Sequence, residues 1–280
     1  MMRRKVPTLA ILGLSVGFSF TANAWNSLGH RIVAQIAYDQ LTPEAKQIYN
    51  RYNHALDGVY SAKSLVSAAP WLDRLRYRNE LWLQAMHYID IPYVIDKTPP
   101  INPDKINAVY AINEAVSILK SETASSYDKG FSLRVLLHVV GDIHQPMHAV
   151  NLFSVNYPKG DQGGNQVVLG ANSVATNLHA YWDNGGGFLK PKQGYSYKYV
   201  VKQAHLLEKR WPCHVNRDEP SAKQWADESH QLAIKVAYLL KKGDKPSKIY
   251  QQSVKTISKQ RLAMAGCRLG KLLNQLVKNQ

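Results

Sequence analysis

Histidines and aspartates recur in this chain at spacings that suit a metal centre. Two pairs stand four residues apart, His138 with Asp142 and His179 with Asp183. In a helix that spacing stacks both side chains on one face, where they can reach one ion. Pro146 ends such a helix, so His148 would approach from the turn that follows. Imidazole nitrogens and carboxylate oxygens are the ligands expected of zinc at a hydrolytic centre, so the pattern predicts a multi-zinc phosphoesterase.

Helical periodicity dominates the elements that must position these residues. Apolar stripes predict helices over residues 32–37, 108–119, 131–140, 200–211, 222–240 and 262–277. The stretch 131–140 is more uniformly apolar than the others, which predicts a buried central helix, and Thr42-Pro43 marks another helix start. Strand signals are poor. Residues 165–169 could form half of a short hairpin, while 89–103, with four prolines, and 183–199 are expected to be loops, the latter a rim over the site.

The first 24 residues have the pattern of a secretion leader. Three basic residues precede a short apolar run and the small-residue site Ala22-Asn23-Ala24. Cleavage after Ala24 would leave 25–280 as a single mainly α domain, exported to the periplasm or beyond, with a C-terminal end that could be mobile. The alternative is an uncleaved anchor, which the short apolar run disfavours. No later stretch predicts a transmembrane helix, so we expect no stable membrane anchor after processing. We also expect the mature chain to be a monomer.

Charge and cysteines narrow the class of protein further. The formal charge of +15 falls by three with the leader, to +12. Such a field attracts polyanions, nucleic acid or phospholipid surfaces among them. Cys213 and Cys267 are the only cysteines, and an exported chain can join them in a disulfide. Two free thiols remain an alternative, because spacing alone does not give their distance.

The new N-terminus would supply a further chelating group. If cleavage follows Ala24, the free amine and carbonyl of Trp25 can close a five-membered ring on a metal, and His30 lies five residues on. The competing interpretation is that Trp25 packs in the core and His30 caps a helix or lies at the surface. Asp73 and His87 are ordinary taken alone, as a helix cap and a lone histidine. No pattern of partner ligands accompanies the remaining histidines, His54, His205, His214 and His230. His144 is better placed to hydrogen-bond to the ligands from behind than to bind metal itself.

Taken together, these pieces resemble a known family. The motifs are Trp71-Leu72-Asp73, His87-Tyr88-Ile89-Asp90, Gly141-Asp142-Ile143-His144-Gln145-Pro146-Met147-His148, Asp161-Gln162-Gly163-Gly164-Asn165 and Asn177-Leu178-His179 through Asp183, preceded by Trp25 and His30. They resemble the three-zinc single-strand nucleases and 3′-nucleotidases of the mung bean nuclease type, distantly related to bacterial zinc-dependent phospholipase C. The resemblance spans residues 25–183, about 60% of the mature chain, and implies that family's helical fold.

The resemblance implies three zinc sites. The first ion would be held by Asp73, His87, His138 and Asp142, and the second by His148, His179 and Asp183. The third would be held by Trp25, His30 and Asp142, so that Asp142 bridges two ions. Single-stranded RNA or DNA would be cut to 5′-nucleotides, and 3′-nucleotides would lose their phosphate. Asp73 would orient the attacking water or accept its proton, and Arg76 could contact phosphate, unless it is only a solvated helix residue. Asp90 would read a base edge, unless it is only a cap, and Asn184 could bind phosphate or steady a ligand.

Two other functions compete with this one. A zinc-dependent phospholipase C shares the Trp amine and the His-x-x-x-Asp bridge, but its second-zinc carboxylate is typically Glu, whereas this chain has Asp183. Gly163-Gly164-Asn165 and Asp90 also favour the nuclease. The other competitor is an exported zinc- or nucleic-acid-binding protein without catalysis. Such a protein would be expected to lose a ligand position, and none is lost here.

Overall fold

The computed structural model describes residues 25–61, 63–75, 80–215 and 221–278. The leader, residues 1–24, lies outside the described residues. The α-helices and strands, with η marking 3-10 helices, are α1 Ser27–Gln40, α2 Pro43–His54, α3 Leu65–Ala68, α4 Trp71–Leu75, η2 Leu81–His87, β1 Pro92–Val94, α5 Ala108–Lys120, α6 Ser126–Ile143, η3 Pro146–Ala149, β2 Asn151–Phe153, α7 Leu178–Asp183, η4 Gly185–Gly187, α8 Tyr197–Arg210, η5 Cys213–Val215, α9 Ala222–Lys235, η6 Ala237–Leu239 and α10 Lys248–Lys278. The expected mainly α fold is confirmed.

Helix α6 is the central element, as its uniformly apolar sequence predicts. It begins with a capping box in which Ser125 and Asp128 bond each other's backbone N–H. Nearly every residue from Lys129 to Ile143 is buried, because α2, α5 and other helices surround it. The helix ends at Ile143, and Pro146 opens η3 as expected of its missing N–H. This rigid element carries two of the expected ligands, His138 and Asp142.

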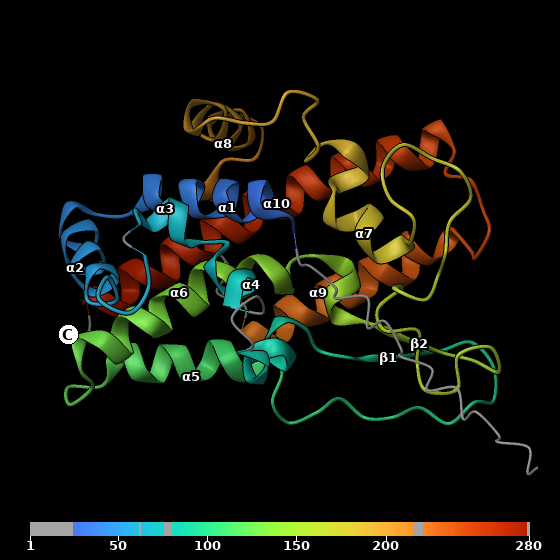
Figure 1. Cartoon of the computed structure of the whole chain (residues 1–280), viewed down its shortest axis with the longest axis horizontal. Helices are drawn as coiled ribbons and strands as arrows, with labels where there is room; N and C mark the ends of the chain where they lie inside the picture. Colours follow the sequence, from blue (N-terminus) through green and yellow to red (C-terminus); the bar gives the residue numbers. More distant parts are fainter. Residues whose placement is uncertain (1–24, 62, 76–79, 216–220, 279–280) are drawn as a thin grey trace, which may run out of the picture.

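Helix α1 is held against the long helix α10, and Figure 1 shows the two side by side across the upper part of the molecule. Their close approach depends on Gly266, where an added Cβ would lie 2.5 Å from the Ile36 Cβ. Apolar residues from Leu28 to Ala37 fill this contact and are buried. Asn26 starts α1 by accepting hydrogen bonds from the N–H groups of Leu28 and Gly29. The packing fixes His30, one turn into α1.

A buried arginine helps to place the short helix α4, which carries Asp73. The Arg134 side chain lies fully buried on α6, and its guanidinium stands 5.5 Å from the centre of the Trp71 ring. Arg134 Nε donates to the Asn53 side-chain oxygen at 2.9 Å, and Nη2 donates to the Asn53 carbonyl. These bonds satisfy part of a charge that burial would otherwise make costly, while Nη1 makes no hydrogen bond among the described residues. Helices α2, α4 and α6 are thereby joined at one point.

The strand predictions need correction. Residues 89–103 were expected to be a loop, but they contain β1, which pairs in parallel with β2. Tyr93 stands opposite Leu152 in this two-stranded sheet. The three-residue strand begins with a proline, which a strand tolerates at its first position. The expected hairpin around 165–169 is reduced to one antiparallel bridge between Val168 and Asn177, with Leu169 N–H donating to the Thr176 carbonyl.

The helix predictions are confirmed in place, with shifted ends. Helix α9 stops at Lys235 and a 3-10 turn follows, so the expected helix over 222–240 is broken. Helix α10 starts at Lys248, well before the expected 262. Thr42 caps α2 with Pro43 at its first turn, as predicted. The open question of the cysteines is answered by a disulfide between Cys213 and Cys267, which ties η5 to α10.

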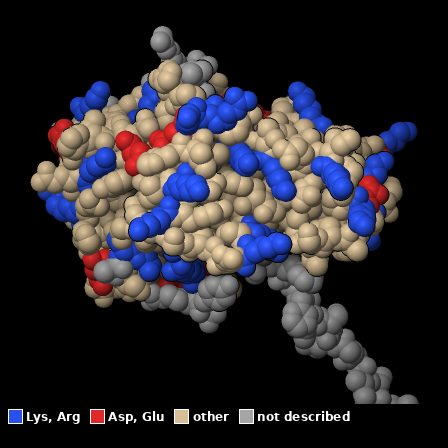
Figure 2. Space-filling model, turned by 90° about the horizontal axis from the view of Figure 1, so that it is seen from above, with Lys and Arg blue, Asp and Glu red and all other residues tan. Residues whose placement is uncertain are grey.

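Basic side chains are spread over the surface. Figure 2 shows many blue lysines and arginines and few red acidic groups on the face that carries α8. This distribution agrees with 35 basic against 20 acidic residues in the whole chain. It is a diffuse positive field rather than a single patch. Within the described residues, every helix falls short of the length and apolarity that a membrane crossing needs.

Candidate metal centre

The first group of expected ligands comes together from three elements. Asp73 lies on α4, His87 at the end of η2, and His138 on α6. His138 Nε2 lies 3.1 Å from His87 Nδ1 and 3.7 Å from Asp73 Oδ1, and His87 Nδ1 lies 3.9 Å from that same oxygen. Three ligand atoms therefore converge within the span that one cation can fill.

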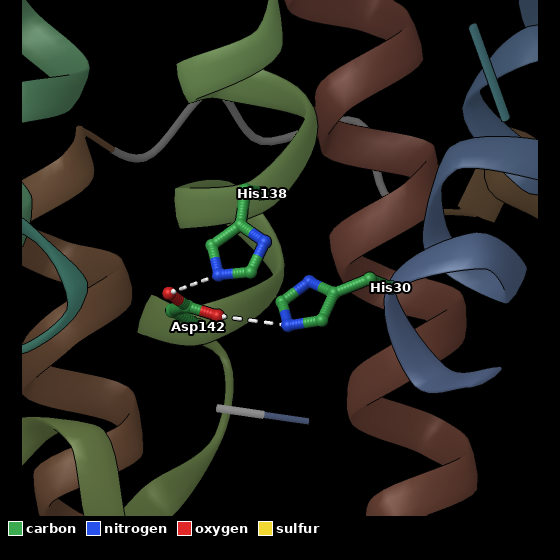
Figure 3. Close-up of side chains that lie close together, drawn as sticks. All are labelled: His30, His138 and Asp142. Carbon is green, nitrogen blue, oxygen red and sulfur yellow. Dashed lines mark ion pairs between the residues drawn. The ribbon is translucent and has the colours of Figure 1, made fainter. Parts of the chain in front are cut away.

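Asp142 stands between two groups and turns one oxygen toward each. Its Oδ2 lies 3.3 Å from His138 Nε2 and 3.1 Å from His87 Nδ1. Its Oδ1 lies 3.3 Å from His30 Nε2, which comes from α1 on the other side. Figure 3 shows His30 facing the α6 pair, and the rings of His30 and His138 stack at 3.8 Å. A carboxylate placed in this way can bridge two ions.

A second group forms where η3 meets α7. His148 Nε2 lies 3.1 Å from His179 Nε2. The Asp183 carboxylate reaches both histidines, with Oδ1 at 3.8 Å from His148 Nε2 and Oδ2 at 3.5 Å from His179 Nε2. All three residues are buried. Asn177 caps α7 through the N–H of Ala180, and this cap sets the four-residue spacing of His179 and Asp183 on one face.

Backbone carbonyls fix which nitrogen of each histidine faces inward. His138 Nδ1 donates to the Ala69 carbonyl at 2.8 Å, His148 Nδ1 to that of His87 at 2.7 Å, and His179 Nδ1 to that of Gly163 at 2.8 Å. With the proton on Nδ1, each Nε2 presents a lone pair. Two lone pairs 3.1 Å apart, as in His148 and His179, repel unless a proton or a cation lies between them. The donor set therefore fits a bound cation.

Buried atoms without a hydrogen-bond partner support the same conclusion. Both ring nitrogens of His30, Nε2 of His87 and Oδ1 of Asp142 are enclosed and make no hydrogen bond among the described residues. Leaving such groups unsatisfied is costly. Because His30 Nε2 and Asp142 Oδ1 face each other at 3.3 Å, an ion coordinated by both residues would satisfy these two atoms. Zinc takes three or four such nitrogen and oxygen ligands at a catalytic site.

The electrostatics keep His30, His87, His148 and Asp142 in the forms that bind metal. His138 is the exception: burial opposes its charge, but Asp142 and Asp73 raise its pKa, so a bound cation would have to displace the proton of that imidazole. Burial, with the charge of His138, lowers the pKa of His30 to about 3, so the ring is neutral. Burial also lowers the pKa of His148 and of His87. For Asp142, burial opposes ionisation, but His138 and His30 hold its pKa well below the usual range. A neutral imidazole and an ionised carboxylate are the species that coordinate.

Trp25 lies beside the group formed by His30, His138 and Asp142. Its side chain is fully buried, and its indole N–H donates to the Gly141 carbonyl at 2.9 Å. A Cβ added at Gly141 would lie 3.1 Å from His30 Nδ1 and 3.8 Å from the Trp25 ring. Trp25 therefore packs in the core, as the competing interpretation holds, but His30 is fully buried and faces Asp142 instead of capping a helix or lying at the surface. The free amine depends on cleavage of residues that lie outside the described ones.

Three predicted substrate contacts have different outcomes. Arg76 lies outside the described residues. Asn184 is placed at the end of α7, but its side-chain amide is engaged: Nδ2 donates to the Ala180 carbonyl at 2.7 Å and Oδ1 accepts from Asn26 at 3.1 Å. Its geometry suits steadying the turn after Asp183. Asp90 lies between η2 and β1, partly buried, where burial and the charges of Asp161 and Asp104 raise its pKa to about 7.

The raised pKa of Asp90 gives a pH-dependent cost to folding. As the pH rises from 4 to 7, Asp90 ionises in the unfolded chain but stays protonated in the folded chain, so stability falls. Asp90→Asn lacks this term. We therefore expect the free energy of unfolding of Asp90→Asn, relative to that of wild type, to increase by about 2 kcal/mol between pH 4 and pH 7, after allowance for partial exposure. Denaturant unfolding of both proteins at pH 4, 5.5 and 7.5 measures it. A constant difference between the two proteins would contradict this.

Some contributors were not singled out from the sequence. Gln145 Nε2 donates to Asp183 Oδ1 at 2.6 Å, and its Oε1 accepts from the Met147 N–H. The sequence feature that could have identified Gln145 is its position between Asp142 and His148, inside the motif that carries the ligands. His144 was expected behind the ligands, and it donates to the Val140 carbonyl and contacts Arg268. A separate exposed group, Asp39, His205 and Glu208, joins α1 to α8 and was missed, because its members lie far apart in sequence.

Comparison with known proteins agrees with this geometry. The sequence model of the family described as S1/P1 Nuclease matches residues 25–278. Nuclease P1 of Penicillium citrinum is 26% identical over 283 residues, covering 90% of this chain and 97% of that protein. Endonuclease 2 of Arabidopsis thaliana is 28% identical over 280 residues, covering 91% of each. Nuclease S1 of Aspergillus oryzae is 27% identical over 212 residues, covering 72% of this chain and 66% of that protein.

Proposed function

Because this chain belongs to the S1/P1 nuclease family and hydrolyses phosphodiester bonds, we propose that it does so with three zinc ions. Its substrates would be single-stranded RNA and DNA, cut to 5′-nucleotides, and 3′-nucleotides, from which it would remove phosphate. One observation carries the proposal. Asp142 places one oxygen toward His30 and the other toward His138 and His87, while His148, His179 and Asp183 form a further group.

The ligand sets follow from these contacts. Asp73, His87, His138 and Asp142 would hold one ion, His148, His179 and Asp183 a second, and Trp25, His30 and Asp142 a third. Bound zinc supplies an acidified water and neutralises the charge that develops on the phosphoryl oxygens. The protein's own contribution is to hold these side chains rigidly, through carbonyls of Ala69, His87 and Gly163 that fix the imidazole orientations.

Residues around the ligands would handle the water and the substrate. The Asp73 side chain keeps 13% of its surface exposed, whereas those of His138 and Asp142 are fully enclosed. Water can therefore reach Asp73, which would orient the attacking molecule or accept its proton. Asp90 would accept hydrogen bonds from a base edge in its ionised form. Arg76 would contact phosphate, and Asn184 would steady the end of α7.

The cellular setting follows from the leader and the charge. We propose export by the segment 1–24, followed by cleavage that frees the Trp25 amine. The disulfide between Cys213 and Cys267 supports an oxidising compartment. An excess of basic side chains favours a polyanionic partner. The mature chain would act as a monomer without a stable membrane anchor.

Metal content and hydrolysis measured together test this function. We expect close to three zinc ions per mature chain by mass spectrometry, with cleavage of single-stranded RNA, single-stranded DNA and 3′-AMP, and loss of all three activities and of thermal stability after chelation. Double-stranded DNA and phosphatidylcholine are the control substrates. A fully active protein with one zinc or none would overturn the three-ion assignment. Turnover of phosphatidylcholine alone would overturn the nuclease assignment.

A further inference from the structure

A cavity of about 650 Å³ opens beside the small sheet, and the metal chemistry does not account for it. Tyr93 of β1 and Leu152 of β2, which stand opposite each other in the sheet, line one wall. Tyr238 of η6 and Tyr157 line another part. Three tyrosines at one cavity are notable because aromatic faces are the surfaces on which unpaired bases stack.

The aromatic wall is held in place. The rings of Tyr93 and Tyr238 pack with centroids 5.5 Å apart and planes inclined by 46°. The Tyr238 hydroxyl donates to the buried Asp161 carboxylate, 2.8 Å from Oδ2 and 3.1 Å from Oδ1. Behind the rings, Leu152 and Val167 are buried and give the cavity an apolar floor. A ring that enters would meet preformed flat surfaces at little conformational cost.

Two adjacent lysines line the same cavity. Lys241 and Lys242 follow η6 after one residue, Leu240, and are both exposed. Lysine ammonium groups next to stacking surfaces suit a ligand that combines a flat base with phosphate. An uncharged aromatic compound would leave both lysines without a partner, and a lipid chain would not need the tyrosines. The combination therefore favours a nucleotide.

Short stretches of chain connect residues that line the cavity to residues of the metal centre. Tyr93 follows Asp90 by three residues and His87 by six, and Leu152 follows His148 by four. At about 3.3 Å per residue, Leu152 lies at most roughly 15 Å of chain from a ligand. Asp90 also lies near enough to Tyr238 for its charge to help raise the pKa of that phenol. A strand whose phosphate lies at the ligands can reach the cavity with a neighbouring nucleotide.

We propose that this cavity, lined by Tyr93, Tyr157, Tyr238, Lys241 and Lys242, binds one unpaired nucleotide of the substrate strand next to the nucleotide at the metal centre. The proposal rests on the nuclease function proposed above. It explains how an enzyme whose chemistry needs only one phosphate would gain affinity for longer single strands. It also predicts that the mononucleotide 3′-AMP, which has no neighbouring nucleotide, gains nothing from the cavity.

The aromatic wall is tested with variants at Tyr93 on the zinc-loaded enzyme. Tyr93→Leu removes the ring, and Tyr93→Trp keeps a stacking surface. With single-stranded dT6, we expect Tyr93→Leu to raise KM roughly tenfold, and Tyr93→Trp to stay near wild type. With 3′-AMP, kcat/KM of all three proteins should agree within about twofold, because that substrate does not extend to Tyr93. Binding of a phosphorothioate dT6, measured by fluorescence anisotropy, should fall in parallel with the KM effect.

The lysines are tested against a matched pair elsewhere. Lys241→Gln/Lys242→Gln is compared with Lys198→Gln/Lys202→Gln, which makes the same charge change on α8, at the opposite edge of the molecule from β1 and β2 in Figure 1. We expect only the first pair to flatten the slope of log affinity for phosphorothioate dT6 against log salt, by about 1.4 for two phosphate contacts. Equal slopes would mean a general field effect and would overturn the lysine contacts.

The outcomes separate this proposal from the one on which it rests. If wild type cleaves neither 3′-AMP nor dT6, the proposed function fails. If wild type cleaves both, and Tyr93→Leu changes KM equally for both or for neither, the nuclease function stands and the cavity proposal is wrong. If Tyr93→Leu loses activity equally on both substrates and also has a lower melting temperature, the variant has a folding defect. In that case Tyr93→Trp is the test: normal dT6 binding at wild-type stability would show that an aromatic ring at position 93 is what the strand needs.

Discussion

We expect replacement of Asp142 with asparagine to lower kcat/KM on single-stranded DNA by about 10³-fold or more, because one side chain serves two ligand groups. Its Oδ1 faces His30 Nε2 at 3.3 Å, and its Oδ2 faces His87 and His138. Asparagine keeps the shape but loses the negative charge and one of the two oxygens. Whichever way the amide turns, an N–H would face one group of ligand nitrogens where an anion is required. We also expect zinc content to fall by about one ion per chain.

The matched control is Asp90→Asn, the same chemical change at a carboxyl that would touch only the substrate base. Because a remote contact affects binding more than the chemical step, we expect roughly a tenfold rise in KM, differing between 3′-nucleotides, with kcat and zinc content nearly unchanged. Measurements of kcat, KM and metal content for both variants on 3′-AMP, 3′-GMP and 3′-CMP decide the matter. Near-normal activity in Asp142→Asn, together with total loss in Asp90→Asn on every base, would reverse the two roles.

The local part of the site could be predicted because its rules act over a few residues. A spacing of four on a helix places His138 with Asp142, and His179 with Asp183, whatever the rest of the fold does. The proline rule ends α6 in time for His148 to turn inward. Which groups meet across 50 or more residues, such as His87 with His138, came from resemblance to a family and not from spacing.

The non-local part could not be predicted, for identifiable reasons. Strand β1 has three residues, starts with Pro92, and pairs with a segment 59 residues later, so no alternation or turn signal announces it. The pairing of Cys213 with Cys267 depends on a distance that the sequence does not contain. Asn184 is of a residue type that often contacts a ligand, yet its side-chain amide is already hydrogen-bonded to Asn26 and Ala180.

Buried charges are the clearest failure of sequence patterning. Arg261 is of a residue type that is usually exposed, yet it is buried and donates to the His144 carbonyl at 3.0 Å, 117 residues away. Arg268 contacts the His144 ring, and both arginines pair with Glu228. This network holds the turn between Asp142 and His148 from the far side. Periodicity assigns arginine to the surface, and only the assembled fold shows where its partners lie.

We expect residues retained in front of Trp25 to lower activity on 3′-AMP and on single-stranded DNA by about 10²-fold while the fold survives. The reason is that an amide nitrogen carries no lone pair for coordination, whereas a free terminal amine does. The Trp25 ring is locked by burial and by its bond to the Gly141 carbonyl, and Asn26 N–H donates to the Asp183 carbonyl at 3.3 Å. These contacts anchor the Trp25 side chain on α6 and the following peptide N–H on the end of α7, the two helices that carry Asp142 and Asp183.

The comparison uses three zinc-loaded proteins: the mature chain from Trp25, the same chain with Gly-Ser before Trp25, and the same chain with Gly-Ser after Gln280 as a matched control. We expect the N-terminal extension to bind about one ion fewer and the C-terminal extension to match the mature chain. His30→Ala should reproduce the loss of that ion without any extension, since His30 Nε2 and Asp142 Oδ1 make no other hydrogen bond among the described residues. Full activity and full zinc content in a stably extended chain would remove the Trp25 amine from the ligands.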